Sequence, residues 1–330
     1  MNPLVLTCGD INGIGPEICV KTINKLYEAN TQQIIFTCPA IVFESTASLV
    51  PPIFNYNIVK KLPSTFDPET VLIFDIGYFQ QDYGCPTKSS GGAAFNAIKE
   101  SFQLVNKKNA GSIVTAPISK LAFKLAGKNY PGQTELLAEM CRSENFLMTF
   151  LSEELICGLT TIHEPIKNIA KLINKVRVAN SIKILFKSLI SDLGIKNPSL
   201  AVLGLNPHAG ENGKIGKEEI ESIAPAIKSV KNISVHGPFV PDAFFGSQLY
   251  KKFSAVLGMY HDQVLIPFKL LNFNTGVNFT AGLRVVRTSP DHGTGYDIAG
   301  KGIANPSSMI EAVKWANRIN ANRLAKKNES

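Results

Sequence analysis

This sequence of 330 residues has few of the features that mark fibrous, disordered or membrane proteins. Charged residues make up only 18% of it and apolar residues 45%, which excludes a disordered chain that cannot build a core. The 25 glycines and 19 prolines exclude a collagen-like or linker-like composition. No apolar run approaches the roughly 20 residues that a membrane-spanning helix needs. The N-terminal residues lack a basic segment and a cleavage site, so we expect no signal peptide, no membrane association and a cytoplasmic location.

The six cysteines include no C-x-x-C pair, and they lie mostly in apolar runs. We therefore expect free thiols, and neither a disulfide framework nor a cysteine zinc site. The net charge is +8, but the basic residues are scattered. The densest group is at the C-terminal end, with Arg318, Arg323, Lys326 and Lys327. Nucleic-acid recognition requires a clustered basic face, so we expect no nucleic-acid partner.

Apolar runs alternate with stretches of helical periodicity along the whole chain. The runs predict buried strands at Leu4–Thr7, Ile34–Thr37, Val71–Phe74, Ser112–Thr115, Leu200–Leu203 and Ala255–Gly258. The periodic stretches predict helices from Pro16 to about Ala29, Gly92 to about Lys107, Ile169 to Leu189 and Ser307 to about Ala325. This alternation indicates an α/β protein with largely parallel sheets, and the length predicts roughly two domains.

Polar residues follow several of the predicted strands, at the edge where open parallel sheets bind ligands. Four of the five histidines are in this position: His163, His208, His261 and His292. A single histidine is more often structural, but several at one sheet edge favour a shared role. Neutral imidazoles from separate loops can hold a divalent metal and leave positions open for a substrate.

Two turns and three separate residues could also bind an anion, and each has a purely structural interpretation as well. The turn Gly9–Glu17 joins the first strand to the first helix. In the turn 131–135, Gln133 and Thr134 could donate to a carboxylate or phosphate, or Thr134 could cap the following helix. Lys269, Asn278 and Arg287 could hold acidic groups, although solvated surface side chains are the usual outcome for Lys and Arg.

A set of motifs resembles the 4-hydroxythreonine-4-phosphate dehydrogenase family of vitamin B6 biosynthesis. The matching segments are 9–17 (GDINGIGPE), 131–135 (PGQTE), 163–165 (HEP), 205–211 (LNPHAGE), 237–242 (GPFVPD), 259–263 (MYHDQ) and 287–294 (RTSPDHGT). The resemblance implies an isopropylmalate-dehydrogenase-like fold with two α/β domains, mostly parallel sheets and an active-site cleft between them. Residues 1–125 and 280–330 would form the cofactor-side domain, and residues 126–279 the domain for metal, substrate and dimerisation.

The resemblance also implies a reaction and the residues that serve it. The reaction is the NAD-dependent oxidation of 4-phosphooxy-L-threonine to a 3-oxo acid, which decarboxylates to 3-amino-2-oxopropyl phosphate. The implied active sites are shared across a homodimer. One divalent metal is implied, Zn or alternatively Mg, Co, Ni or Mn, with the ligands His163, His208 and His261. The implied substrate contacts are Gln133, Thr134, Lys269, Asn278 and Arg287.

Segment 292–306 is similar to the adenine-side NAD loop of isopropylmalate and isocitrate dehydrogenases. By this similarity Asp297 would bind the ribose hydroxyls and Asn305 the adenine, with His292 and Gly293 against the adenosine. An aspartate at the ribose position favours NAD, with NADP as the alternative, because a 2′-phosphate would meet like charge. Asp242 and Lys269 are the candidate catalytic residues, although Asp242 could instead cap the helix after Pro241.

One residue departs from the family pattern, which usually reads Gly-His-Thr-Glu where this chain has Gln133. Glutamine can hydrogen-bond but cannot take up a proton as histidine does. A related metal-dependent dehydrogenase acting on another four-carbon acid phosphate or diol acid is therefore the alternative function. Three further alternatives are a β-decarboxylating dehydrogenase of the isopropylmalate type, a transferase of related fold without redox activity, and a non-enzymatic anion-binding protein.

Overall fold

The computed structural model describes residues 3–28, 32–63, 65, 67, 69–108 and 110–329. The chain forms two compact units, one of Met1–Glu144 with Arg284–Asn317 and one of Asn145–Leu283 with Arg318–Ser330. Residues 126–144, which the sequence assigned to the second domain, pack with the first unit. One contact that holds them there is the stacking of Tyr130 on Phe95, with ring centroids 6.3 Å apart.

The first unit is built on a parallel sheet. Its strands, in sheet order, are β3 (Asn55–Val59), β4 (Thr70–Asp75), β2 (Ile34–Cys38), β1 (Leu4–Thr7), β5 (Ser112–Thr115) and β12 (Val286–Pro290). Every pairing between neighbours in this order is parallel. The central strands are buried along their whole length, as the continuous apolar runs predicted. The edge strand β3 is exposed instead, which is why its sequence shows no apolar run.

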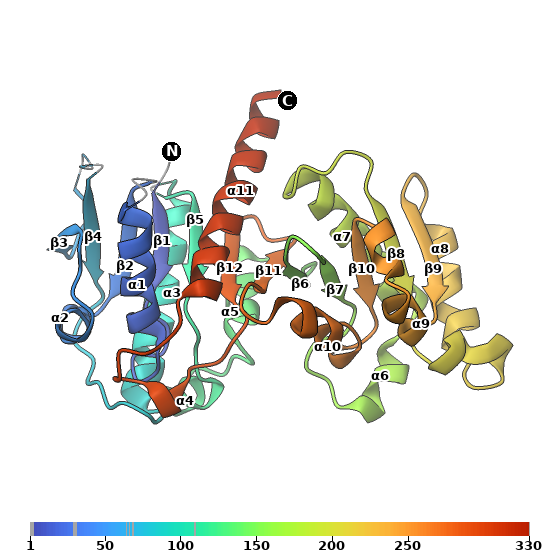
Figure 1. Ribbon diagram of the computed structural model, residues 1–330, viewed down its shortest axis with the longest axis horizontal. Coiled ribbons are helices and arrows are strands. Elements are labelled where there is room, and N and C mark those ends of the chain that lie inside the picture. The colour runs from blue at the N-terminus through green and yellow to red at the C-terminus, as the bar shows by residue number, and fades with distance from the viewer. Residues whose placement is uncertain are drawn as a thin grey trace. The chain divides into compact units, whose positions relative to one another are not determined.

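Helices cover the first sheet. They are α1 (Gly15–Glu28), α2 (Ala40–Leu49), α3 (Lys88–Asn106), α4 (Lys120–Leu125) and α5 (Gln133–Cys141). Helix α3 packs on β1, β2 and β5, and α1 packs on β2 (Figure 1). The predicted end of α1 at Ala29 lies outside the described residues. Helix α3 begins four residues before the predicted Gly92 because Thr87 and Ser90 form a reciprocal capping box.

The second unit has a sheet of mixed direction. Its strands, in sheet order, are β11 (Val277–Ala281), β6 (Leu147–Leu151), β7 (Cys157–Leu159), β10 (Ala255–Gly258), β8 (Ser199–Leu203) and β9 (Ser234–Phe239). Strand β6 is antiparallel to both of its neighbours. The pairings from β7 through β10 and β8 to β9 are all parallel. A largely parallel architecture is therefore confirmed, with β6 as the exception.

The helices of the second unit are α6 (Ile166–Leu172), α7 (Lys175–Ser191), α8 (Ala224–Ser229), α9 (Pro241–Gly246) and α10 (His261–Asn272). The prediction of one helix from Ile169 to Leu189 was wrong, because the helix is interrupted between α6 and α7. Ile173 is extended there, and the Asn174 side chain accepts a hydrogen bond from the backbone N–H of Arg177. Asparagine at this position starts a new helix rather than continuing the old one.

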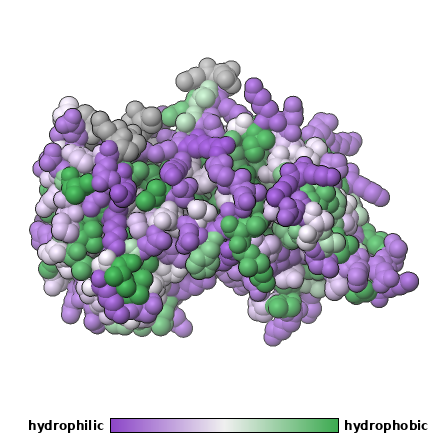
Figure 2. All heavy atoms as spheres, in the orientation of Figure 1, coloured by the Kyte–Doolittle hydropathy of each residue, from purple (hydrophilic) through white to green (hydrophobic). Residues whose placement is uncertain are grey.

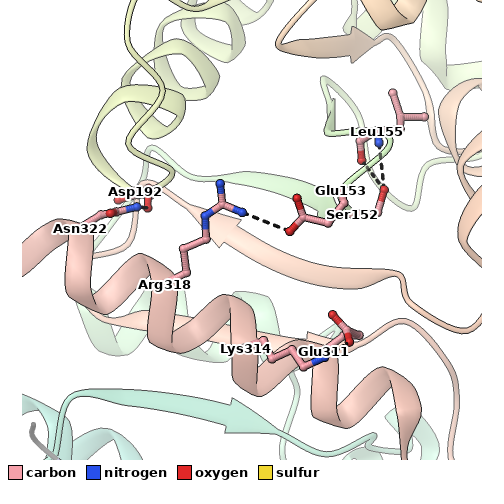
Figure 3. Close-up of polar contacts among 8 residues, drawn as sticks. All are labelled: Ser152, Glu153, Leu155, Asp192, Glu311, Lys314, Arg318 and Asn322. Atoms are coloured by element: carbon pink, nitrogen blue, oxygen red, sulfur yellow. Dashed lines mark hydrogen bonds and ion pairs between the residues drawn. The ribbon is translucent and has the colours of Figure 1, made fainter.

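The last helix, α11 (Ser307–Glu329), contributes residues to both units. Lys314, Arg318 and Arg323 of this helix form ion pairs, of which Figure 3 shows that of Arg318 with Glu153, at 3.2 Å. Arg323 pairs with Asp192 at 2.8 Å, and the carbonyl of Asp192 also accepts from Asn322. Half of the basic group at the C-terminal end therefore serves to hold α11 to the second unit.

The cores of the units are apolar. In the second unit, buried residues of β6, β7, β8, β10, α9 and α10 form one cluster that includes Phe150, Phe244 and Phe268. On the face drawn in Figure 2, hydrophilic residues predominate and hydrophobic ones form scattered patches. Within the described part of the chain, no helix is both long and apolar enough to span a bilayer.

Candidate functional site

Three histidines follow the ends of three adjacent parallel strands in the second unit. His163 comes after β7, His208 after β8 and His261 after β10, and β10 lies between the other two strands in the sheet. The prediction that these side chains share one sheet edge is confirmed for these three. His292 follows β12, which belongs to the first unit.

The rings of His163 and His261 lie close together, with centroids 5.7 Å apart. His261 Nδ1 donates to Asp262 Oδ1 at 2.7 Å, which leaves Nε2 for a ligand. Two imidazoles that bind one ion through nitrogen at about 2.0–2.1 Å have a similar separation. His208 does not join them, since the described residues contain no group of three or more His, Cys, Asp or Glu side chains arranged to hold a metal ion.

His208 lies on an irregular segment, η1 (Pro207–Gly213). His208 through Asn212 all have positive φ, a conformation that persists only where the surroundings impose it. The buried carboxylate of Glu219 holds the residues just before this segment, since Oε1 accepts from the backbone N–H groups of Leu205 and Asn206 at 2.7 and 2.8 Å. Sequence reasoning missed Glu219, because no motif links it to the loop that it holds.

Gln263 joins the loops that follow β8 and β10. Its amide donates to the Gly204 carbonyl at 2.6 Å, and its oxygen accepts from the Met259 N–H at 2.7 Å. The side chain is buried, so both of its polar ends are satisfied within the protein. The sequence predicted no role for Gln263, although it belongs to the motif at 259–263. The feature that could have indicated a role is its position two residues after His261.

A cavity of about 250 Å³ opens beside His208. It is lined by Leu205, Asn206, Pro207, His208, Pro241, Asp242, Tyr260 and Gln263. Asp242 is exposed in the first turn of α9, where Val240 is the cap and no side chain makes a capping bond. The capping interpretation of Asp242 was therefore wrong, and its carboxylate faces a cavity that also contains an imidazole.

Lys269 and Asn278 also belong to the second unit. Lys269 is half-buried in the last turn of α10, and Asn278 is half-buried in β11. The other predicted substrate residues, Gln133, Thr134 and Arg287, belong to the first unit.

Arg287 is the largest fully buried side chain of the protein's described part, with 1% of its surface exposed. Nε donates to Thr115 Oγ1 at 2.9 Å, one terminal nitrogen to Thr134 Oγ1 at 3.3 Å and the other to Ser289 Oγ at 2.9 Å. Burial lowers the pKa of Arg287 to about 9, although the nearby carboxylate of Glu135 acts in the opposite direction. The expectation of a solvated surface arginine was wrong, because β12 carries this side chain into the sheet.

Thr134 and Gln133 open helix α5 beside this arginine. Gly132 is the helix cap, so the capping interpretation of Thr134 was wrong, and its hydroxyl instead accepts from Arg287. The Gln133 Oε1 atom is buried and has no hydrogen-bond partner. Such an orphaned acceptor beside a buried cation is expected where a ligand completes the hydrogen bonding.

The predicted nucleotide residues lie on one loop of the first unit, between β12 and α11. His292, Gly293, Asp297 and Asn305 are all exposed there. Asn305 Oδ1 accepts from the Ser307 N–H and hydroxyl, which leaves its amide nitrogen directed elsewhere. The loop rests on the turn Gly9–Glu17, whose residues are buried throughout. The structural interpretation of that turn is thus the observed one, since Thr294 covers the start of α1.

Comparisons with known proteins give one consistent result. A family model described as pyridoxal phosphate biosynthetic protein PdxA matches residues 29–316. The 4-hydroxythreonine-4-phosphate dehydrogenase of Sulfurihydrogenibium sp. is 38% identical over 320 residues, which cover 96% of this chain and 98% of that protein. The one of Geobacter metallireducens is 40% identical over 325 residues, covering 95% and 94%.

The chain belongs to the 4-hydroxythreonine-4-phosphate dehydrogenase family. A crystal structure of the family from Klebsiella pneumoniae is 34% identical, covers 97% of this chain and 100% of its own, and superposes with a TM-score of 0.84. Isocitrate dehydrogenase from Methylococcus capsulatus shares the fold, with 15% identity and a TM-score of 0.51. The expected family and fold class are both confirmed.

Proposed function

We propose that this chain oxidises 4-phosphooxy-L-threonine to a 3-oxo acid with NAD as oxidant. The acid then decarboxylates to 3-amino-2-oxopropyl phosphate, in the biosynthesis of vitamin B6. The relatives named for a 4-hydroxythreonine-4-phosphate dehydrogenase support this activity. The observation that carries the proposal is the placement of His163, His208 and His261 after three adjacent parallel strands.

The three histidines would hold one divalent cation. His163 and His261 fit this role, since their rings are neighbours and Asp262 fixes the tautomer of His261. His208, constrained by Glu219, is the proposed third ligand. Imidazole donors suit Zn, with Co, Ni or Mn as alternatives, and suit Mg least. When bound, the cation would act as a Lewis acid on a substrate oxygen.

Arg287 would bind an anionic group of the substrate. Even with its pKa lowered to about 9, the guanidinium carries its charge at neutral pH. A guanidinium fork donates well to phosphate or carboxylate, and an anion would offset part of the cost of burying this charge. The Thr134 hydroxyl, which accepts from Arg287, would donate to the same anionic group. The unsatisfied Gln133 Oε1 would instead accept a hydrogen bond from a hydroxyl or ammonium group of the substrate. Lys269 and Asn278 are the proposed contacts from the second unit.

Proton transfer from the substrate hydroxyl needs a base within hydrogen-bond reach. Asp242 is the proposed candidate because its carboxylate lines the cavity that His208 also lines. Lys269 is the second proposed catalytic residue, as an acid rather than a base: its ammonium would return a proton after decarboxylation.

The loop with Asp297 and Asn305 would bind the nucleotide. Asp297 would accept from the ribose hydroxyls and Asn305 would contact the adenine, with His292 and Gly293 beside the adenosine. NAD held by these residues would supply the hydride acceptor for the oxidation. The carboxylate of Asp297 favours NAD over NADP through repulsion of a 2′-phosphate. We further propose a homodimer with shared active sites and a cytoplasmic location.

The test is NADH formation from 4-phosphooxy-L-threonine, measured by absorbance, with protein as purified, after chelation and after addition of each divalent metal. We expect activity that chelation removes and zinc or another metal restores. Activity that persists in full after complete metal removal would refute the metal role.

The alternative substrate class, another four-carbon acid phosphate or a diol acid, is favoured by Gln133, which cannot carry a proton. NAD binding without turnover of 4-phosphooxy-L-threonine, combined with turnover of such an acid, would establish that alternative. A folded, metal-loaded protein that binds no NAD would refute the dehydrogenase proposal itself.

A further inference from the structure

The turn Gly9–Glu17 and the first turns of helix α1 are buried and contact the loop that is proposed to bind the nucleotide. Their contacts reach both ends of that loop. At its start, the Ile14 N–H donates to the Thr294 carbonyl at 2.8 Å. A β-carbon on Gly13 would lie 2.4 Å from the same carbonyl oxygen, so only glycine allows this approach.

The buried carboxylate of Asp10 holds the loop two residues further along the chain, at Tyr296. The Tyr296 hydroxyl donates to Asp10 Oδ2 at 2.8 Å, and the Ser90 hydroxyl donates to the same atom at 3.2 Å. Asp10 Oδ1 accepts from the backbone N–H of Asn12 at 3.0 Å. Burial raises the pKa of Tyr296, so its hydroxyl keeps the proton that this hydrogen bond requires. The segment just before Asp297 is thereby fixed to the turn that follows β1.

The far end of the loop is held from the next turns of α1. Glu17 Oε1 accepts from the Ala304 N–H at 2.7 Å. Lys21 Nζ donates to Glu17 Oε1, to the Gly302 carbonyl and to the Ala304 carbonyl at 2.8, 2.9 and 2.8 Å. These three bonds use every proton that a lysine ammonium can donate. The residue after this clamp is Asn305.

We infer that Lys21 and Tyr296 are positioning residues for the nucleotide, holding the 292–305 loop so that Asp297 and Asn305 are presented in fixed register. The inference rests on the proposed function, because it assigns the binding of NAD to this loop. The physical reason is preorganisation: a loop that is already ordered loses less conformational entropy when the nucleotide binds. Neither side chain needs to touch the nucleotide for this effect.

The experiment compares Lys21→Met and Tyr296→Phe with wild type and with Lys25→Met. Lys25 lies on the same helix, and its ion pair with Glu28 is exposed, so it is a matched control for loss of a lysine. NAD affinity is measured by calorimetry without substrate. Amide exchange of residues 292–305 and the melting temperature are measured on the same samples, followed by steady-state kinetics.

We expect Lys21→Met to weaken NAD binding about tenfold and Tyr296→Phe about threefold, with Lys25→Met unchanged. Amide exchange of the Ala304 N–H should accelerate in Lys21→Met. The KM for NAD should rise with the affinity loss, while kcat at saturating NAD and the KM of the acid substrate stay within about twofold, a split that general destabilisation does not produce. Lys21→Arg, which keeps the charge and donors, should recover part of the affinity.

The inference is overturned if wild type binds NAD and the two variants bind it as tightly as Lys25→Met does. It is also overturned if the variants show a lower kcat together with a higher KM for NAD and a higher KM for the acid substrate. Should Lys21→Met fail to fold, Tyr296→Phe decides alone, since it removes one oxygen atom. A wild-type protein that binds no NAD overturns the proposed function as well, which separates the two failures.

Discussion

Replacement of Arg287 by methionine should impair substrate binding far more than folding. The structure supplies two opposing terms for the free energy of unfolding. A pKa lowered from 12.5 to about 9 corresponds to about 5 kcal/mol against the charged side chain in the folded state. Methionine removes that cost. It also removes hydrogen bonds, among them those to the hydroxyls of Thr115, Thr134 and Ser289, each worth about 1.5–3 kcal/mol when the donor is charged.

The two terms oppose each other, so we expect Arg287→Met to lower the free energy of unfolding by no more than about 4 kcal/mol. Loss of a buried cation that pairs with a substrate anion is far larger in its effect on turnover. We expect kcat/KM for the acid substrate to fall by about 100-fold or more, with the affinity for NAD unchanged.

The assay combines urea unfolding, NAD calorimetry and steady-state kinetics. The matched control is Arg284→Met, since Arg284 is an exposed arginine of the same unit. A loss of more than about 4 kcal/mol in the free energy of unfolding would show that Arg287 is a structural residue. A kcat/KM equal to that of the Arg284 variant would refute its role in binding the anion.

Three further predictions concern the metal, the nucleotide and pH. His208→Ala should lower the metal content of the purified protein whereas His236→Ala should not, and equal metal content by mass spectrometry in both variants would exclude His208 as a ligand. Asp297→Ala should raise the KM for NAD. It should also reduce the preference for NAD over NADP by about tenfold, because it removes the like-charge repulsion of a 2′-phosphate. An unaltered NADP/NAD ratio of kcat/KM would contradict the assignment. Burial raises the pKa of Asp10 above its ordinary 3.8, so the stability it contributes is fully present below pH 3.8 and is lost as pH rises through the folded-state pKa. Wild type should therefore lose stability relative to Asp10→Asn as the pH is raised over that interval, and a difference between the two urea midpoints that is constant with pH would show that Asp10 is not the cause.

Six of the strands and the family could be predicted from the sequence, whereas the buried strands β6, β7 and β12 were missed. Strands such as β1, β5 and β10 are covered on both faces, so their whole length must be apolar, and apolar runs located them to the residue. The edge strands β3 and β9 are partly solvated and left no such signal. The histidines were found because parallel strands deliver the residues that follow them to one edge, a property of topology rather than of local sequence.

The burial of Arg287 and the contacts of Gln263 and Glu219 depend on the tertiary structure. Residues alone favoured a solvated Arg287, yet hydroxyls from Thr115, Thr134 and Ser289, far apart along the chain, surround it once β12 pairs with β5. Gln263 and Glu219 likewise acquire their roles only when their loops meet. The sequence by itself determined six of the strands, the family and the sheet edge on which the histidines of the second unit lie. The physical reason is that a strand covered on both faces has a continuous apolar run, and that parallel strands place the residues that follow them at one edge. The folded structure alone decided which charges are buried and which loops are clamped, because those depend on contacts between residues that no local pattern relates.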